Sequence, residues 1–190
     1  MKNYLTGSLK LAFVGLMCLA NNIVHAQGGL FSTSAGVTNF SGTTPLENIE
    51  AENKKCQAML NTGTGELAIR MNMNGFVFPN KLMQEHFNEN YIESEKYPTA
   101  TFSGKVSKML DYTKDGSYDV SATGKFTVHG VTKERTINGK ISVASGKITI
   151  TSDFSVALVD HNIEVPSIVF VKIAQVISVK SQYVLAAYKK

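Results

Sequence analysis

The sequence predicts an all-β protein in which about eight antiparallel strands close into one barrel, with one short amphipathic helix. Long segments alternate apolar and polar residues, the links between them are short, and one segment has helical spacing instead. Because each long strand is apolar on one face only, the sheet must close on itself or fold into a sandwich. We expect closure, which leaves no free edge and an interior wide enough for side chains or one slim ligand.

The first 26 residues resemble a cleaved secretory signal peptide. Lys2 and Lys10 flank the start of an uninterrupted apolar run at residues 11–20, and residues 24–26 (Val-His-Ala) suit a signal peptidase. The run has about ten residues, short of the roughly 20 needed to span a bilayer, so a retained anchor is the weaker alternative. We expect cleavage after Ala26 and a periplasmic protein exported by a bacterium.

The mature chain, residues 27–190, is predicted to be a single domain with a core and a pocket. Of the formal net charge of +4, two lysine charges belong to the signal peptide, so the mature charge is about +2. So small a charge argues against a nucleic acid partner. Cys18 lies in the signal peptide, so Cys56 has no disulfide partner and is expected to be a small buried apolar residue.

Three strands are predicted before the helix, at residues 30–40, 46–53 and 66–78, where β-forming residues are frequent but the alternation is less regular. Antiparallel pairing is expected throughout, because short links join consecutive strands as hairpins.

A helix is predicted at residues 80–92. Met83, Phe87 and Tyr91 recur every four positions behind Pro79-Asn80, a start of the capping type. We expect this apolar stripe to pack on the barrel wall or over an open end.

Strand periodicity is clearest after the helix. Residues 118–128 alternate six apolar or small residues with five polar ones, and residues 102–106, 137–143 and 148–158 repeat the pattern. The C-terminal stretch, residues 168–188, is long enough for two strands or one strongly bent strand.

Small residues occupy four positions on the predicted inward face: Gly104, Ala122, Gly124 and Gly139. Two interpretations stay open. They leave volume for a ligand, or the glycines allow the strands to coil where the barrel bends.

Three motifs in order resemble the YceI-like family: EHFNENY at residues 85–91, KYPTATFSG at 96–104 and GKFTVHGVTK at 124–133. The resemblance runs from about Gly65 to the C-terminus. Residues 40–51 differ from the aspartate-x-x-histidine-serine segment with which better-known members open.

The resemblance implies an exported, lipocalin-like antiparallel barrel whose elongated apolar cavity holds a polyisoprenoid chain, such as that of an isoprenoid quinone or carrier lipid. It implies no cofactor other than this lipid ligand. Transient contact with a membrane would accompany its exchange. A monomer and a modest dimer are equally compatible with the sequence.

A site for such a chain is expected to be an apolar tube with one or two polar groups at its mouth. His129, Asp160 and His161 are the candidate mouth contacts, and their alternative role is to shape turns. The inward residues expected to line the cavity, which could equally be plain core, are Phe76, Phe78, Phe102, Val120, Phe126, Val128, Ile150 and Phe154.

No catalytic residue and no metal site is expected. His86, His129 and His161 remain after cleavage, but no HExxH motif, paired cysteines or aspartate-rich loop accompanies them. The chain has no Gly-x-Ser-x-Gly elbow, and Cys56 has no histidine near it in sequence. The sequence therefore predicts a protein that is not an enzyme.

Two functions of different classes fit these expectations. A lipid carrier requires a continuous cavity longer than it is wide. A structural or protein-interaction module of the envelope, docking a partner through its outer face or the helix at residues 80–92, would have a core packed solid.

Overall fold

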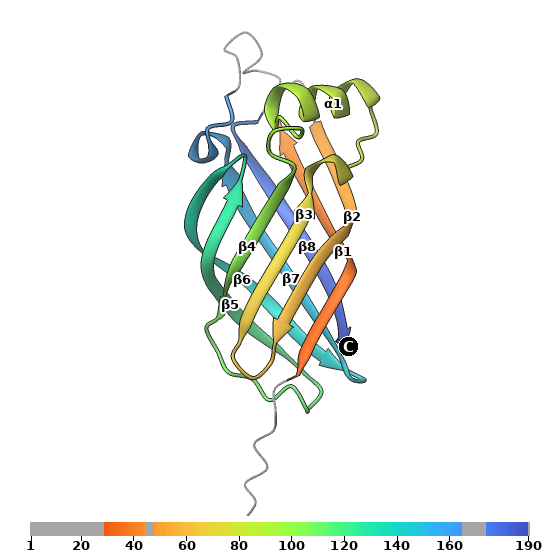
Figure 1. Cartoon of the computed structure of the whole chain (residues 1–190), viewed down its shortest axis with the longest axis vertical. Helices are drawn as coiled ribbons and strands as arrows, with labels where there is room; N and C mark the ends of the chain where they lie inside the picture. Colours follow the sequence, from red (N-terminus) through yellow and green to blue (C-terminus); the bar gives the residue numbers. More distant parts are fainter. Residues whose placement is uncertain (1–28, 45–47, 165–173, 190) are drawn as a thin grey trace, which may run out of the picture.

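Eight strands form one closed antiparallel barrel in the computed structural model, which describes residues 29–44, 48–164 and 174–189 (Figure 1). Each strand pairs with its sequence neighbours, and the last pairs with the first. The predicted fold class is confirmed. The strands are β1 (Leu30–Thr43), β2 (Asn48–Asn61), β3 (Glu66–Asn72), β4 (Thr99–Val106), β5 (Gly116–Val128), β6 (Val131–Ala144), β7 (Lys147–Ala157) and β8 (Val176–Ala187).

Some predicted boundaries differ from the observed ones. The strand predicted at residues 66–78 ends at Asn72, where the 3-10 turn η1 (Met73–Gly75) begins. Within this turn Gly75 packs on the Asn53 side chain, and a Cβ at residue 75 would lie 2.7 Å from Asn53 Nδ2, so the turn has no room for a larger residue unless Asn53 moves. In the C-terminal stretch predicted at residues 168–188, the described residues form one strand, β8. The predicted signal peptide and residues 168–171 lie outside the described residues.

The helix prediction is confirmed, with an unexpected second half. Asn80 caps α1 (Lys81–His86), its side chain accepting from Leu82 N at 2.9 Å. The chain then continues as the π-helical turn η2 (Phe87–Tyr91), in which the Ile92 N–H donates to Phe87 O at 2.9 Å. Figure 1 shows the helix lying across one end of the barrel. Its apolar stripe, Met83, Phe87 and Tyr91, lines the interior beneath it.

The opposite end of the barrel is densely packed. Residues whose side chains are at most 1% exposed come from four strands there: Leu60, Ile141, Ile148 and Leu185. Also on β8, Tyr183 is 2% exposed and its hydroxyl lies 2.8 Å from Thr38 Oγ1. Burial raises the pKa of Tyr183 to about 12, so this hydroxyl stays protonated.

The inward glycines allow close backbone approach. Gly104 and Gly124 are opposite each other on β4 and β5, and a Cβ on Gly124 would collide with the Gly104 Cα. A Cβ on Gly139 would collide with the carbonyl oxygen of Thr151 on β7. These contacts favour strand coiling over free volume as the reason for glycine.

Three of the barrel's ladders have six residue pairs or fewer. β2 and β3 pair over four residue pairs, and β4 and β5 and also β6 and β7 pair over six, whereas β5 and β6 pair over thirteen. Above the β2–β3 ladder, Val77 forms a backbone bridge with Glu52, and Asn53 Nδ2 donates to Asn72 O at 2.9 Å. Main chain therefore fills this break in the wall.

Candidate functional site

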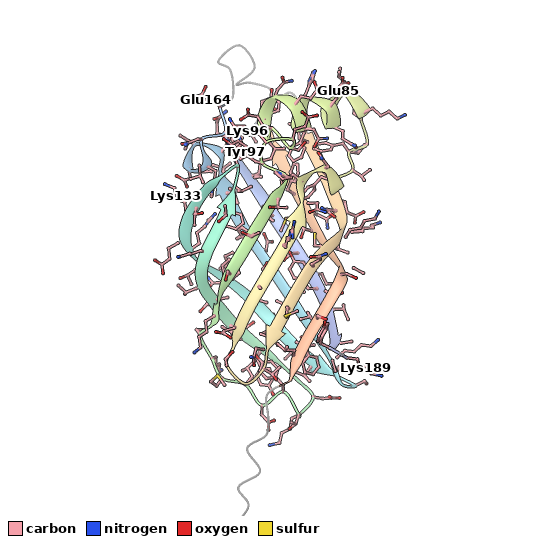
Figure 2. The ribbon with its side chains drawn as sticks, in the orientation of Figure 1. Glu85, Lys96, Tyr97, Lys133, Glu164 and Lys189 are labelled. Carbon is pink, nitrogen blue, oxygen red and sulfur yellow. The ribbon has the colours of Figure 1, made fainter. Side chains whose placement is uncertain are left out.

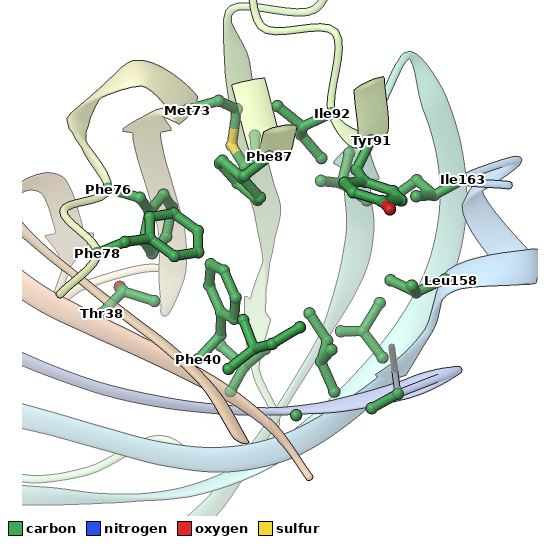
Figure 3. Close-up of a pocket in the computed structure, with 18 of the residues that line it drawn as sticks. Thr38, Phe40, Met73, Phe76, Phe78, Phe87, Tyr91, Ile92, Leu158 and Ile163 are labelled. Atoms are coloured by element: carbon green, nitrogen blue, oxygen red, sulfur yellow. The ribbon is translucent and has the colours of Figure 1, made fainter. Parts of the chain in front are cut away.

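A cavity of about 440 Å³ lies inside the helix end of the barrel (Figure 3). Small-molecule sites typically enclose about 300–1,000 Å³. The inward rows of the strands form its walls, and η1, α1 and η2 form its roof. Among the described residues that line it, no side chain is acidic, lysine or arginine, and four have polar atoms: Thr38, Asn80, His86 and Tyr91.

Five of the eight predicted lining residues face this cavity: Phe76, Phe78, Phe126, Val128 and Phe154. The other three border a second, deeper cavity of about 60 Å³: Phe102, Val120 and Ile150. Phe126 and Phe154 border both cavities, and their rings meet edge to face at 5.9 Å. This aromatic pair therefore stands between the upper and lower parts of the interior.

Four phenylalanines join the roof to the wall. Phe87 of η2 lies 5.4 Å from Phe40 of β1 and 5.0 Å from Phe78, measured between ring centroids, and Phe76 lies 5.2 Å from Phe40. Figure 3 shows these rings together on one side of the cavity. Because the cluster draws on β1, η2 and the segment after η1, it fixes the helix over the barrel end.

The polar groups that face the cavity come mainly from the helix. His86 and Tyr91 line it, as does Asn80, whose side chain is occupied in capping α1. Burial raises the pKa of Tyr91, so its phenol remains neutral and can donate a hydrogen bond without bringing a charge into the cavity. Neither His86 nor Tyr91 was among the predicted mouth contacts.

The predicted mouth contacts lie elsewhere. His129, Asp160 and His161 are absent from the described linings of both cavities. His129 is 9% exposed and occupies the β5–β6 turn, while Asp160 is exposed on the 3-10 turn η3 (Leu158–His161). His161 is fully buried, with its Nδ1 3.2 Å from the carbonyl oxygen of Val131. This placement favours the turn-shaping alternative.

His129 connects three segments at the helix end. Its Nε2 lies 2.8 Å from Glu93 Oε2, in the loop after the helix, and its Nδ1 lies 3.0 Å from the carbonyl oxygen of His161. The His129 ring therefore joins the loop after the helix, the β5–β6 turn and η3. Its hydrogen bond with Glu93, with a smaller contribution from the Lys96 charge, lowers the pKa of Glu93.

Glu93→Gln is expected to lower the melting temperature near neutral pH and to have no effect in acid. Because folding lowers the pKa of Glu93, its stabilisation is present above the ordinary value of 4.5 and is lost as the pH falls through the folded-state pKa. Thermal melts at a series of pH values measure this. Glu95→Gln, at an exposed neighbour, is the control, and a Glu93→Gln offset that persists at low pH would contradict the assignment.

Other site types find no support in the described part of the chain. No cluster of three or more His, Cys, Asp or Glu residues there is placed to bind a metal. No helix there has the length and apolar character to cross a membrane. Cys56 is buried as predicted, and burial raises the pKa of its thiol, which remains protonated 3.4 Å from Thr38 Oγ1.

Several solved structures have a fold similar to that of this chain. A polyisoprenoid binding domain from Saccharophagus degradans, implicated in plant cell wall breakdown, has a TM-score of 0.68 at 15% identity, covering 85% of this chain and 99% of that one. Burkholderia cenocepacia BcnA gives 0.66 at 15%, covering 78% and 95%. The Campylobacter jejuni YCEI protein gives 0.59 at 18%, covering 76% and 87%. At these identities the similarity establishes the fold.

The sequence comparisons are specific at the family level. No curated protein matches the chain. The family model of the YceI-like domain matches residues 20–185, which is most of its length and includes the three motifs. The chain therefore belongs to the YceI-like family.

Proposed function

We propose that the protein binds one long apolar lipid of isoprenoid type, a polyprenyl chain or the tail of an isoprenoid quinone, in the cavity under the helix. The observation that carries this proposal is the cavity of about 440 Å³, whose described lining has four polar side chains and is otherwise apolar. The polyisoprenoid binding domain among the structural neighbours supports the same ligand class.

Burial alone would bind such a ligand. Removing apolar surface from water contributes about 25 cal/mol per Å², so a prenyl chain needs no charged partner in the cavity. Selectivity would come from cavity shape, with Tyr91 and His86 near the polar end of the lipid. The filled-barrel alternative requires a solid core, and the cavity does not favour it.

We propose that this role is non-catalytic and that the protein acts in the bacterial periplasm. The described cavity lining contains no serine, cysteine or carboxylate that could act as a nucleophile beside a base. We infer that the protein stores or ferries the lipid through water, with transient membrane contact when the lipid enters or leaves.

Native mass spectrometry of the mature protein, purified from its periplasm and followed by organic extraction, tests the proposal. We expect a bound mass in the range of a polyprenyl lipid or isoprenoid quinone. A protein that is purified without ligand, and that stays free when octaprenyl lipids and quinones are offered, would overturn it.

A further inference from the structure

The upper part of the barrel wall between β6 and β7 is not joined by a backbone ladder. The register ends at the pair Gly139 and Ser152, and the described residues above it, 131–138 of β6 and 153–157 of β7, pair with β5 and β8 instead. We call this region the β6–β7 gap. At β2–β3 main chain fills the equivalent break, whereas here Arg135 Nη2 donates to the carbonyl oxygen of Ser155 at 2.7 Å.

Arg135 belongs to the inward row of β6. It lies opposite Gly124 of β5 and alternates with Ile137 and Gly139, which border the deeper cavity. The centre of its guanidinium lies 5.8 Å from the Phe126 ring centroid and 5.7 Å from that of Phe154. An arginine therefore sits against the aromatic pair that borders both cavities.

This charge has no acidic partner among the described residues. Six salt bridges occur there, and none includes Arg135 or Lys133. Lys133 is the preceding residue of the same inward row, opposite Phe126, and Figure 2 shows it at the helix end of the barrel. Two cations therefore occupy neighbouring positions of this row, Arg135 half-buried and Lys133 exposed, and neither forms a salt bridge among the described residues.

The donors of Arg135 exceed its described bonds. A guanidinium has five N–H groups in a planar fork that matches phosphate and carboxylate oxygens, and the bond to Ser155 uses one nitrogen. Nearby His161 adds no charge, because burial, together with the positive charge of Arg135, lowers its pKa. The electrostatic environment of the gap favours an anion.

We propose that the β6–β7 gap binds the oxyanion head group of the lipid, such as the phosphate of a prenyl phosphate, with Arg135 as the binding residue and Lys133 as a second cation. This inference rests on the proposed function, because the chain of the same lipid lies in the cavity. Phe154 lines the cavity and its ring lies 5.7 Å from the centre of the Arg135 guanidinium, so the gap adjoins the cavity.

The first test needs no variant. Geranylgeranyl phosphate and geranylgeraniol share one chain and differ in the head group, and their Kd values are measured by competition against a fluorescent prenyl probe. Hydrogen bonds to a charged group predict at least about tenfold tighter binding of the phosphate. The preference should fall as salt is raised. Equal Kd values at low salt would overturn the inference.

Variants then locate the site. Arg135→Gln should bring the two Kd values together by weakening the binding of the phosphate, while Arg135→Lys should keep part of the preference. Lys125→Gln removes the same charge from the exposed outer row of β5 and is the matched control. A preference unchanged in Arg135→Gln would overturn the assignment. Thermal melts check that each variant is folded. If Arg135→Gln does not fold, Lys133→Gln replaces it, with a smaller expected loss of the preference for geranylgeranyl phosphate.

The outcomes separate this inference from the proposed function. If neither probe binds, the proposed function itself fails. If both bind equally, the cavity binds lipid and the head-group site fails alone. Inorganic phosphate is the third probe, and binding as tight as that of geranylgeranyl phosphate would show a site for free phosphate and overturn the lipid assignment.

Discussion

Val128→Trp combined with Val156→Trp is expected to abolish lipid binding while the barrel stays folded. Both valines line the main cavity, on β5 and β7. Each methylene excluded from the site costs about 0.8 kcal/mol, so excluding one isoprene unit of about five carbons costs about 4 kcal/mol. That corresponds to about a thousandfold weaker Kd, which the competition assay measures with geranylgeraniol.

The control for this double variant places the same side chains outside the barrel. Thr127→Trp with Asp153→Trp lies on the outer rows of the same two strands and should bind geranylgeraniol as the wild type does. The melting temperature of the cavity variant should not fall, because the indoles enter existing space. Full lipid binding by the cavity variant would show that the lipid lies elsewhere.

Leu185→Ala is expected to destabilise the protein by about 4 kcal/mol and Leu158→Ala by about 2 kcal/mol, although both remove the same atoms. Leu185 is 0% exposed and lines neither described cavity, so its loss creates a new void in packed core. Leu158 is 7% exposed and faces the main cavity, so little new void forms. Urea unfolding of lipid-free protein measures both.

The comparison of the two leucines tests whether the cavity exists in solution. Equal losses in the free energy of unfolding would mean that, without ligand, the side chains at the helix end pack together and leave no cavity. A loss at Leu185 below about 1 kcal/mol would contradict dense packing at the far end.

The strand alternation after residue 100 predicted which side chains face inward, because a period of two assigns each residue to one face. It could not say where the interior is filled. Phe102 and Phe126 are opposite each other on β4 and β5, yet only Phe126 borders the main cavity. That distinction depends on the height of each residue in the barrel, which strand tilt and register set.

The sequence pattern does not identify the inward row of β1. It contains Gly36, Thr38, Phe40 and Gly42, which do not read as an apolar face. Tyr183 of β8 occupies the space over Gly36, so a distant strand supplies the missing apolar surface. Phe40, part of the aromatic cluster under the helix, was therefore not predicted to line the cavity.

Arg135 was missed for a related reason. The alternation of apolar and polar residues in β6 begins at Ile137, because Lys133 and Arg135 make the earlier part of its inward row polar. That row is polar where β7 has diverged from β6, so the charges meet the gap instead of a packed neighbour. The role of His129 could not be predicted from the sequence either, because its partner Glu93 is 36 positions away and approaches it only in the folded chain.

The pairing of β1 with β8 has a consequence for the order in which the protein folds. Thr38 and Tyr183, which form their hydrogen bond across this seam, are 145 positions apart in the chain. Contacts at such separation carry a large loop-closure cost and form late, whereas the β5–β6 hairpin needs only a two-residue turn. The cavity is therefore complete only when the β1–β8 ladder has formed. A lipid could enter it only after nearly the whole chain is available to fold.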